Sequence, residues 1–154
     1  RLGMALASID QYDEALAMFR RAVEADPRDG DAQRNLAAAL FDARDIEGAA
    51  LHARQAVALS PEDPVAHDLL GRALAVQGRF DEAISAFERS LAIKPNYRAL
   101  TNLAAVEYQT GEYAEAVEHI EQATRGRDAW PVIECEVDHL ARRGARHKAM
   151  FACF

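Results

Sequence analysis

Cysteine, tryptophan and lysine are scarce in this sequence of 154 residues. The two cysteines, Cys135 and Cys153, have neither the spacing of metal ligands nor a Cys-x-x-Cys partner, so we expect ordinary thiols. Lysine occurs only at Lys94 and Lys148, which leaves nearly all positive charge on arginine, a side chain suited to bidentate contact with carboxylates. No apolar run is long enough to span a bilayer, and no signal peptide is visible.

The sequence also lacks the motifs of catalysis and of nucleic-acid binding. It contains no glycine-rich phosphate loop, no His-Glu-x-x-His motif and no serine or cysteine nucleophile with a partner pattern. The formal net charge of −7 at pH 7 argues against a nonspecific nucleic-acid surface. We therefore expect no enzyme activity, no cofactor, no metal ion and no nucleic-acid partner.

What the sequence does contain is an internal repeat. Alanine recurs at Ala15, Ala49 and Ala83, each 34 positions apart, and then at Ala116 and Ala149, each 33 apart. Prolines follow the same period at positions 27, 61 and 95. A fixed period of this length predicts a stack of helical hairpins. His52 and His119 fall in one column of the repeat, which indicates an interhelical or shared surface role and not catalysis.

Each column of the repeat has a physical cause. Antiparallel helices approach closely only where side chains are small, which explains Gly71 on a first helix and Ala83 on a second. The turn within a hairpin needs a residue tolerant of left-handed backbone, hence Gly78. Pro61 and Pro95 lack an amide hydrogen and end a helix. The corresponding residues elsewhere are Gly3, Ala37 and Ala104 at crossings, and Gly111 and Gly144 at turns.

The pattern Leu70-Gly71…Leu74…Gly78…Phe80…Ala83…Phe87…Pro95 resembles a tetratricopeptide repeat (TPR). The resemblance covers nearly all of the chain. It implies an all-α fold, a right-handed superhelix of stacked antiparallel helix hairpins (an α-solenoid). We expect a single array with units at about 1–29, 30–62, 63–95 and 96–128, and a degraded fifth unit at 129–154. The chain begins at Arg1, partway into a first helix, so we expect a fragment of a longer protein.

Several positions depart from the repeat. Residues 1–10 are expected to form the end of a first helix and residues 12–26 a second helix. Arg44–Asp45 replaces the turn glycine, and Glu107 occupies a column otherwise held by leucine. The fifth unit is either a polar cap or an ordinary repeat cut short at its C-terminal end.

In TPR domains the first helix of each pair lines a concave groove that binds extended peptides or partner helices. Matching columns places there Asp31, Arg34, Asn35, Ala38, Phe41 and Asp42; Val65, Asp68, Leu69, Arg72 and Val76; and Arg98, Thr101, Asn102, Ala105, Tyr108 and Gln109. Our hypothesis is a peptide site formed by Arg34, Asn35, Asp68, Arg72, Arg98, Asn102 and Tyr108. Arginines suit carboxylates, and asparagine amides suit a peptide backbone, so the expected ligand is an acidic or C-terminal peptide.

Some TPR domains carry a carboxylate clamp for chaperone tails, which this sequence matches only in part. Arg34 and Arg98 correspond to two of its basic residues. Ala38 and Leu69 stand where the clamp needs asparagine, which weakens the prediction of a chaperone ligand.

The leading interpretation is therefore a protein–protein interaction scaffold, from a bacterial cytoplasm or, if an upstream signal was removed, a periplasm. One alternative is an accessory repeat domain of a larger enzyme such as a glycosyltransferase, with catalysis outside this chain. Another is self-association through Trp130, Phe151 and Phe154.

Overall fold

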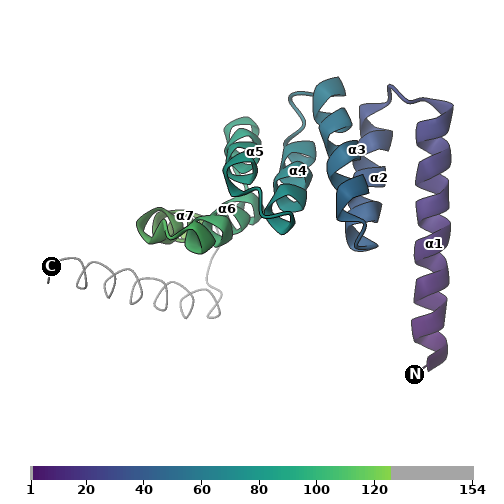
Figure 1. Ribbon diagram of the computed structural model, residues 1–154, viewed down its shortest axis with the longest axis horizontal. Helices are drawn as coiled ribbons and strands as arrows, with labels where there is room; N and C mark the ends of the chain where they lie inside the picture. Colours follow the sequence, from purple (N-terminus) through teal and green to yellow (C-terminus); the bar gives the residue numbers. More distant parts are fainter. Residues whose placement is uncertain (1, 126–154) are drawn as a thin grey trace, which may run out of the picture.

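The computed structural model describes residues 2–125, with side chains from Asp13 onward, and all regular elements of this part of the chain are helices (Figure 1). The fifth unit, with Trp130, Phe151 and Phe154, lies outside the described residues. The helices are α1 (Leu2–Ala25), α2 (Gly30–Asp42), α3 (Ile46–Leu59), α4 (Pro64–Val76), α5 (Phe80–Ile93), α6 (Tyr97–Thr110) and α7 (Tyr113–Arg125).

The helices form three antiparallel hairpins, α2–α3, α4–α5 and α6–α7, stacked side by side (Figure 1). Each second helix also packs on the first helix of the next pair. The first helices α2, α4 and α6 additionally contact one another in sequence order. Since α3, α5 and α7 make no comparable contacts in the described part of the chain, the first helices form the inner face of the curve.

Carboxylate and amide side chains start four of these helices, because they satisfy backbone N–H groups that have no partner within the helix. Oδ1 of Asp29 accepts hydrogen bonds from the amides of Asp31 and Ala32. Asp45, Asp63 and Asn96 cap α3, α4 and α6 in the same way. Asp63 is followed by Pro64 at the first helical position, which needs no amide donor.

The three hairpin turns share one geometry although only two contain glycine. Arg44, Gly78 and Gly111 have φ values of 66°, 75° and 93°. In each case the amide of the following residue donates to the carbonyl of the residue four positions before the turn residue, over 2.8–3.0 Å. This bond satisfies a carbonyl at the helix end, so the predicted replacement of glycine by Arg44 is confirmed.

The predicted turn near residue 11 is wrong, because α1 runs without a break from Leu2 to Ala25. The repeat places Asp10 in the column of Gly78, and an aspartate does not by itself force the left-handed backbone of a turn. The second half of α1 nevertheless behaves as a second helix, since Leu16, Phe19 and Val23 pack against the core of the α2–α3 hairpin.

Side chains of complementary size fill each helix crossing. A Cβ at Gly71 would lie only 2.7 Å from Cε1 of Phe87, so the ring occupies the space that glycine leaves. The equivalent pair in the α2–α3 hairpin is Ala37 and Ala53, both fully buried. Two small residues there replace one glycine and one aromatic ring, so this crossing contains less side-chain volume.

Candidate functional site

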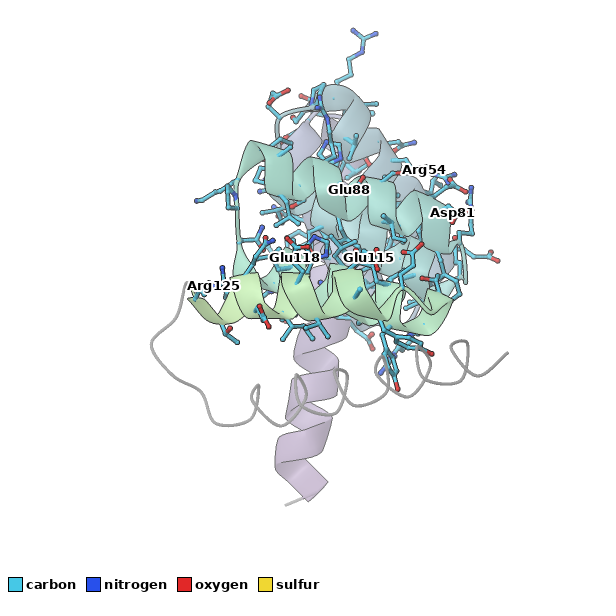
Figure 2. All side chains as sticks on the ribbon, turned by 90° about the vertical axis from the view of Figure 1, so that its left-hand side faces the viewer. Arg54, Asp81, Glu88, Glu115, Glu118 and Arg125 are labelled. Atoms are coloured by element: carbon cyan, nitrogen blue, oxygen red, sulfur yellow. The ribbon has the colours of Figure 1, made fainter. Side chains whose placement is uncertain are left out.

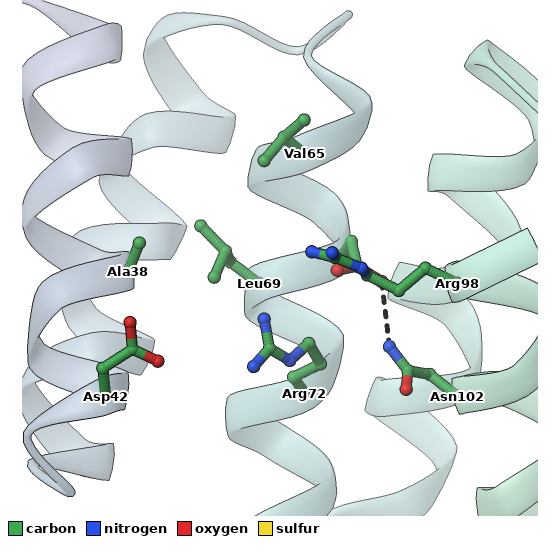
Figure 3. Close-up of a pocket in the computed structure, with 8 residues that line it drawn as sticks. Ala38, Asp42, Val65, Leu69, Arg72, Arg98 and Asn102 are labelled. Carbon is green, nitrogen blue, oxygen red and sulfur yellow. Dashed lines mark hydrogen bonds between the residues drawn. The ribbon is translucent and has the colours of Figure 1, made fainter. Parts of the chain in front are cut away.

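A cavity of about 480 Å³ opens on the inner face between α2, α4 and α6 (Figure 3). It is lined by Ala38, Asp42, Val65, Asp68, Leu69, Arg72, Arg98 and Asn102. All eight come from first helices and stand in the columns predicted to face the groove. Helices that are packed on both sides hold these side chains, so the cavity is part of the rigid array.

Asp68 is the most enclosed charged group of the cavity, with 6% of its surface exposed. Nδ2 of Asn102, from the next hairpin, donates to its Oδ1 over 3.2 Å. Burial raises the pKa of Asp68, while the hydrogen bond from Asn102 and the charges of Arg72 and Arg98 act in the opposite direction. Asn102 therefore fixes a carboxylate, and the same amide retains an oxygen able to accept a hydrogen bond.

Two guanidinium groups flank this carboxylate. Cζ of Arg72 lies 4.3 Å from the centre of the Phe41 ring, a cation–π contact that orients the group. Arg98 is exposed and reaches toward the cavity from the start of α6 (Figure 3). Within residues 13–125, neither arginine has a carboxylate within 4.0 Å. Both can therefore bind an external acceptor without first breaking an ion pair.

Arg34, by contrast, lies outside the cavity. Its Nη1 is 2.7 Å from Oδ2 of Asp63 and 2.9 Å from Oδ1 of Asp31. The hydrogen bond with Asp63 holds the pKa of Arg34 above its ordinary value. Asp63 also caps α4, so the pair ties α2 to the start of the next hairpin. The neighbouring Asn35 is exposed and also lies outside the cavity.

We expect Asp63→Ala to lower the free energy of unfolding by about 2 kcal/mol, because it removes both a helix cap and the partner of Arg34. Asp63→Asn keeps a capping oxygen and should cost about half as much. Urea denaturation measures both. Asp45→Ala is the matched control, since Asp45 caps α3 and forms no ion pair in the described structure. Equal losses for Asp63→Ala and Asp45→Ala would show that the link to Arg34 contributes nothing.

Tyr108 belongs to the α6–α7 hairpin and not to the cavity. It packs against the cluster of Ala104, Ala116 and Ile120, and its ring meets Tyr113 edge-on at 5.3 Å. Of the seven site residues predicted from the sequence, the structure thus gathers Asp68, Arg72, Arg98 and Asn102 in one cavity, while Arg34, Asn35 and Tyr108 have other surroundings.

Of the two roles predicted as alternatives for His52 and His119, a shared surface role or an interhelical one, the structure shows the interhelical one. Nδ1 of His52 lies 2.7 Å from Oε1 of Gln33, between α3 and α2. Nδ1 of His119 lies 2.8 Å from Oε2 of Glu107, between α7 and α6. Burial lowers the pKa of His52. Since Gln33 offers an acceptor there, a neutral ring with its proton on Nδ1 fits this contact.

One polar column escaped sequence analysis. Nε2 of Gln33 donates to the carbonyl of Pro27 over 2.9 Å, and Nε2 of His67 lies 2.9 Å from the carbonyl of Pro61. Both side chains are buried, and both hold the loop that precedes their own helix. The signal that could have revealed them is their spacing of 34 residues, the period of the repeat.

The outer face is charged and solvated. Figure 2 shows side chains of α3, α5 and α7 at the surface, among them Arg54, Asp81, Glu88, Glu115, Glu118 and Arg125, all of them exposed. The described residues hold no group of three or more histidine, cysteine or acidic side chains arranged to bind a metal ion. Nor does this part of the chain include a helix with the length and apolar character needed to cross a membrane.

A stack of helical hairpins with a polar cavity on its inner face defines a class of α-solenoid scaffolds for protein–protein interaction. The chain belongs to the tetratricopeptide repeat family. Two family models of that description match it, one over residues 1–64 and the other over residues 63–129.

Curated relatives share the repeat but are much longer. The peroxisomal targeting signal receptor of Eremothecium gossypii is 32% identical over 120 residues, which cover 75% of this chain and 21% of the receptor. The small glutamine-rich tetratricopeptide repeat-containing protein 2 of Mycosarcoma maydis is 28% identical over 120 residues, covering 77% of this chain and 34% of that protein. The chain thus spans about a fifth to a third of the length of these relatives.

A solved structure confirms the fold. MamA from Desulfovibrio magneticus RS-1, residues 41 to the end, superposes with a TM-score of 0.71. The match covers 82% of this chain and 74% of the MamA chain, at 23% sequence identity.

Proposed function

We propose that this chain binds an extended segment of a partner protein across the inner face of the array, with the cavity between α2, α4 and α6 as its principal site. The main observation behind this proposal is that the guanidinium groups of Arg72 and Arg98 lie beside the buried carboxylate of Asp68. Neither arginine forms an ion pair within the described structure. Polar groups held in this way on rigid helices lose little conformational entropy when a ligand binds.

Each polar group has a distinct part in this proposal. Arg72, oriented by Phe41, and Arg98 donate to carbonyl or carboxylate oxygens of the partner. Asn102 has a carbonyl oxygen that accepts no hydrogen bond within residues 13–125, and it can accept from a backbone N–H. Val65, which is 51% exposed, and Ala38 provide apolar surface beside these groups.

The relatives support binding as opposed to catalysis. The Eremothecium gossypii relative is, by its name, a receptor for a targeting signal. We propose that this chain likewise recognises a short segment of another protein and is itself not catalytic. We also propose, as expected from the sequence, that the protein is bacterial and acts in the cytoplasm, or in the periplasm if an upstream signal was removed.

Selection of short linear peptides from a random phage-displayed library tests the proposal. We expect peptides that bind the wild-type chain, and we expect Arg72→Glu with Arg98→Glu to weaken them at least about 100-fold, because both donors are replaced by like charges. Fluorescence anisotropy measures the affinities, and circular dichroism confirms the fold.

The matched control is Arg54→Glu with Arg89→Glu, which makes the same change of charge on the exposed outer helices α3 and α5. Peptides should bind this variant as they bind the wild type. A library that yields no binding peptide, or peptides that distinguish neither variant from the wild type, would refute binding in the groove.

A further inference from the structure

The buried carboxylate of Asp68 has an unused acceptor. Oδ1 binds Asn102, but within residues 13–125 Oδ2 accepts no hydrogen bond, and no cation lies within 4.0 Å of either oxygen. No side-chain oxygen or nitrogen of the described structure is both fully buried and unpartnered, so Oδ2 retains access to solvent. Asp68 is only 6% exposed and lines the cavity, so this access is through the cavity.

Charges of opposite sign alternate along the cavity. Asp42 on α2 faces Arg72 on α4 (Figure 3), and the charges of Arg72 and of Arg98 on α6 both act on Asp68. These are the four ionisable residues among its lining residues, two carboxylates and two guanidinium groups, so their formal charges cancel. Such an arrangement is complementary to a ligand that carries both signs of charge and gives no net attraction to a ligand that carries only one.

We propose that the cavity selects a peptide segment of mixed charge, in which a lysine or arginine side chain binds Asp68 and a nearby carboxylate binds Arg98 or Arg72. This inference rests on the proposed function and narrows its ligand. It adds a basic residue to the acidic or C-terminal peptide expected from the sequence, because a ligand with carboxylates alone would place them beside two of the protein's own.

The shape of the cavity suits a basic side chain. Ala38, Val65 and Leu69 line it beside the charged groups, so the methylene stem of a lysine or arginine can lie on apolar surface while its cationic end reaches a carboxylate. Asp68 offers the stronger contact of the two carboxylates, since an ion pair gains more where little water competes. Asp42 is exposed, so it adds little binding energy and mainly favours a positively charged side chain in the ligand.

Binding of the basic side chain should depend on pH. Burial raises the pKa of Asp68, so this group takes up a proton at a higher pH than an ordinary aspartate. The protonated acid has no negative charge, and affinity for a lysine-containing peptide should therefore fall as the pH drops through this raised pKa. The other charged groups that line the cavity are Arg72, Arg98 and Asp42, and all three are common to the wild type and the variant described next.

The test uses peptides enriched by the phage selection, each synthesised with its basic residues changed to glutamine and, separately, with its acidic residues changed to glutamine. We expect both changes to lower affinity at least about tenfold. Asp68→Asn should weaken the parent peptide by a similar factor and leave the peptide without basic residues nearly unaffected. The pH dependence of the parent peptide should also decrease in this variant.

The Asp68→Asn substitution keeps almost the shape of the native side chain and an oxygen that can still accept from Asn102, and circular dichroism verifies that the variant folds. Asp42→Asn gives a second, milder variant, and Asp81→Asn on the outer face is the control. Peptides of a single charge sign, or an Asp68→Asn variant that does not distinguish the two synthetic peptides, would overturn the mixed-charge inference while leaving peptide binding intact. Absence of any enriched peptide would instead refute the proposed function.

An amidated version of each peptide separates two sources of its carboxylate. If amidation of the C-terminus alone lowers affinity as much as removal of all acidic side chains, the terminal carboxylate is the group that binds Arg98 or Arg72. If amidation has no effect, acidic side chains supply it. Either result retains a ligand of mixed charge, provided that the basic residues are also required.

Discussion

Phe87→Ala is expected to lower the free energy of unfolding by about 3–5 kcal/mol. Phe87 is 1% exposed and is the largest fully buried side chain in the described structure. It packs with Leu74, Leu103 and Val106, so it joins the α4–α5 hairpin to α6. Removing the ring loses its transfer free energy and leaves a cavity that two packed hairpins can fill only in part.

Substitution of Gly71, which lies against the Phe87 ring, tests the same packing more directly. Gly71→Ala alone should cost about 1–3 kcal/mol, because the added Cβ would lie within 2.7–2.9 Å of three atoms of the Phe87 ring. In the Phe87→Ala background the same substitution should raise stability by about 1 kcal/mol, since alanine is the better helix former and the ring is absent. The double variant reproduces the Ala37–Ala53 pair of the preceding hairpin.

Urea denaturation gives the free energies, and hydrogen exchange shows whether the loss is confined to α4, α5 and α6, since repeat arrays do not always unfold as one unit. The decisive quantity is the sign of the Gly71→Ala effect in the two backgrounds. Destabilisation by similar amounts in both would mean that Gly71 is required for a reason other than the space taken by Phe87.

The sequence predicted the array because helix crossings, turns and helix ends each restrict the residue type strongly. Small residues at crossings, a left-handed residue at each hairpin turn and a proline after α1, α3 and α5 produce a signal that repeats with the fold. Even Arg44 was predicted at a turn, since its column is defined by Gly78 and Gly111. The exception is α1, where Asp10 fills the turn column and the helix continues. The residue type in a column shows whether a turn is favoured there, and aspartate is compatible both with a turn and with a continuous helix.

The site was less predictable, because a column defines the face of a helix and not the partner of a side chain. Asp68, Arg72, Arg98 and Asn102 came together since they share that face on adjacent helices. Arg34 shares it too, but it pairs with Asp63, 29 residues away and at a helix start. Whether an arginine on this face pairs with an internal carboxylate depends on differences of a few ångströms between helices. The spacing of residues along the chain does not predict these distances.

The contact between the buried carboxylate of Glu107 and His119, in the last described hairpin, gives the second large expected effect. Glu107 is 4% exposed, in a column where the preceding hairpins have the buried residues Leu40 and Leu74, and it lies 2.8 Å from Nδ1 of His119. We expect His119→Ala to lower stability by about 1–3 kcal/mol near neutral pH, because it leaves a buried carboxylate without its partner. Glu107→Leu combined with His119→Ala should be at least as stable as the wild type and up to about 3 kcal/mol more stable, since a leucine fills this column elsewhere.

The pH dependence distinguishes the charge of Glu107 from its packing. Burial is the main cause that raises the pKa of Glu107 above its ordinary value of 4.5, the charges of Glu112 and Glu115 raise it further, and the hydrogen bond with His119 lowers it. The folded state therefore binds this proton more tightly than the unfolded chain. The contribution of Glu107 is most favourable below the unfolded pKa and is lost as the pH rises through the folded pKa.

In His119→Ala the lowering influence is gone, so the folded pKa rises and the loss of stability should extend to higher pH than in the wild type. In the double variant, leucine replaces Glu107, so the contribution of this carboxyl group to the pH dependence of stability is absent. Urea denaturation from about pH 4 to about pH 8 spans the range in which a raised carboxyl pKa and a histidine titrate. Profiles of equal slope for His119→Ala and the double variant would mean that Glu107 is solvated despite its position. In that case Leu40 and Leu74 contribute packing in the first two hairpins, and Glu107 occupies the same position in the third hairpin without an electrostatic cost.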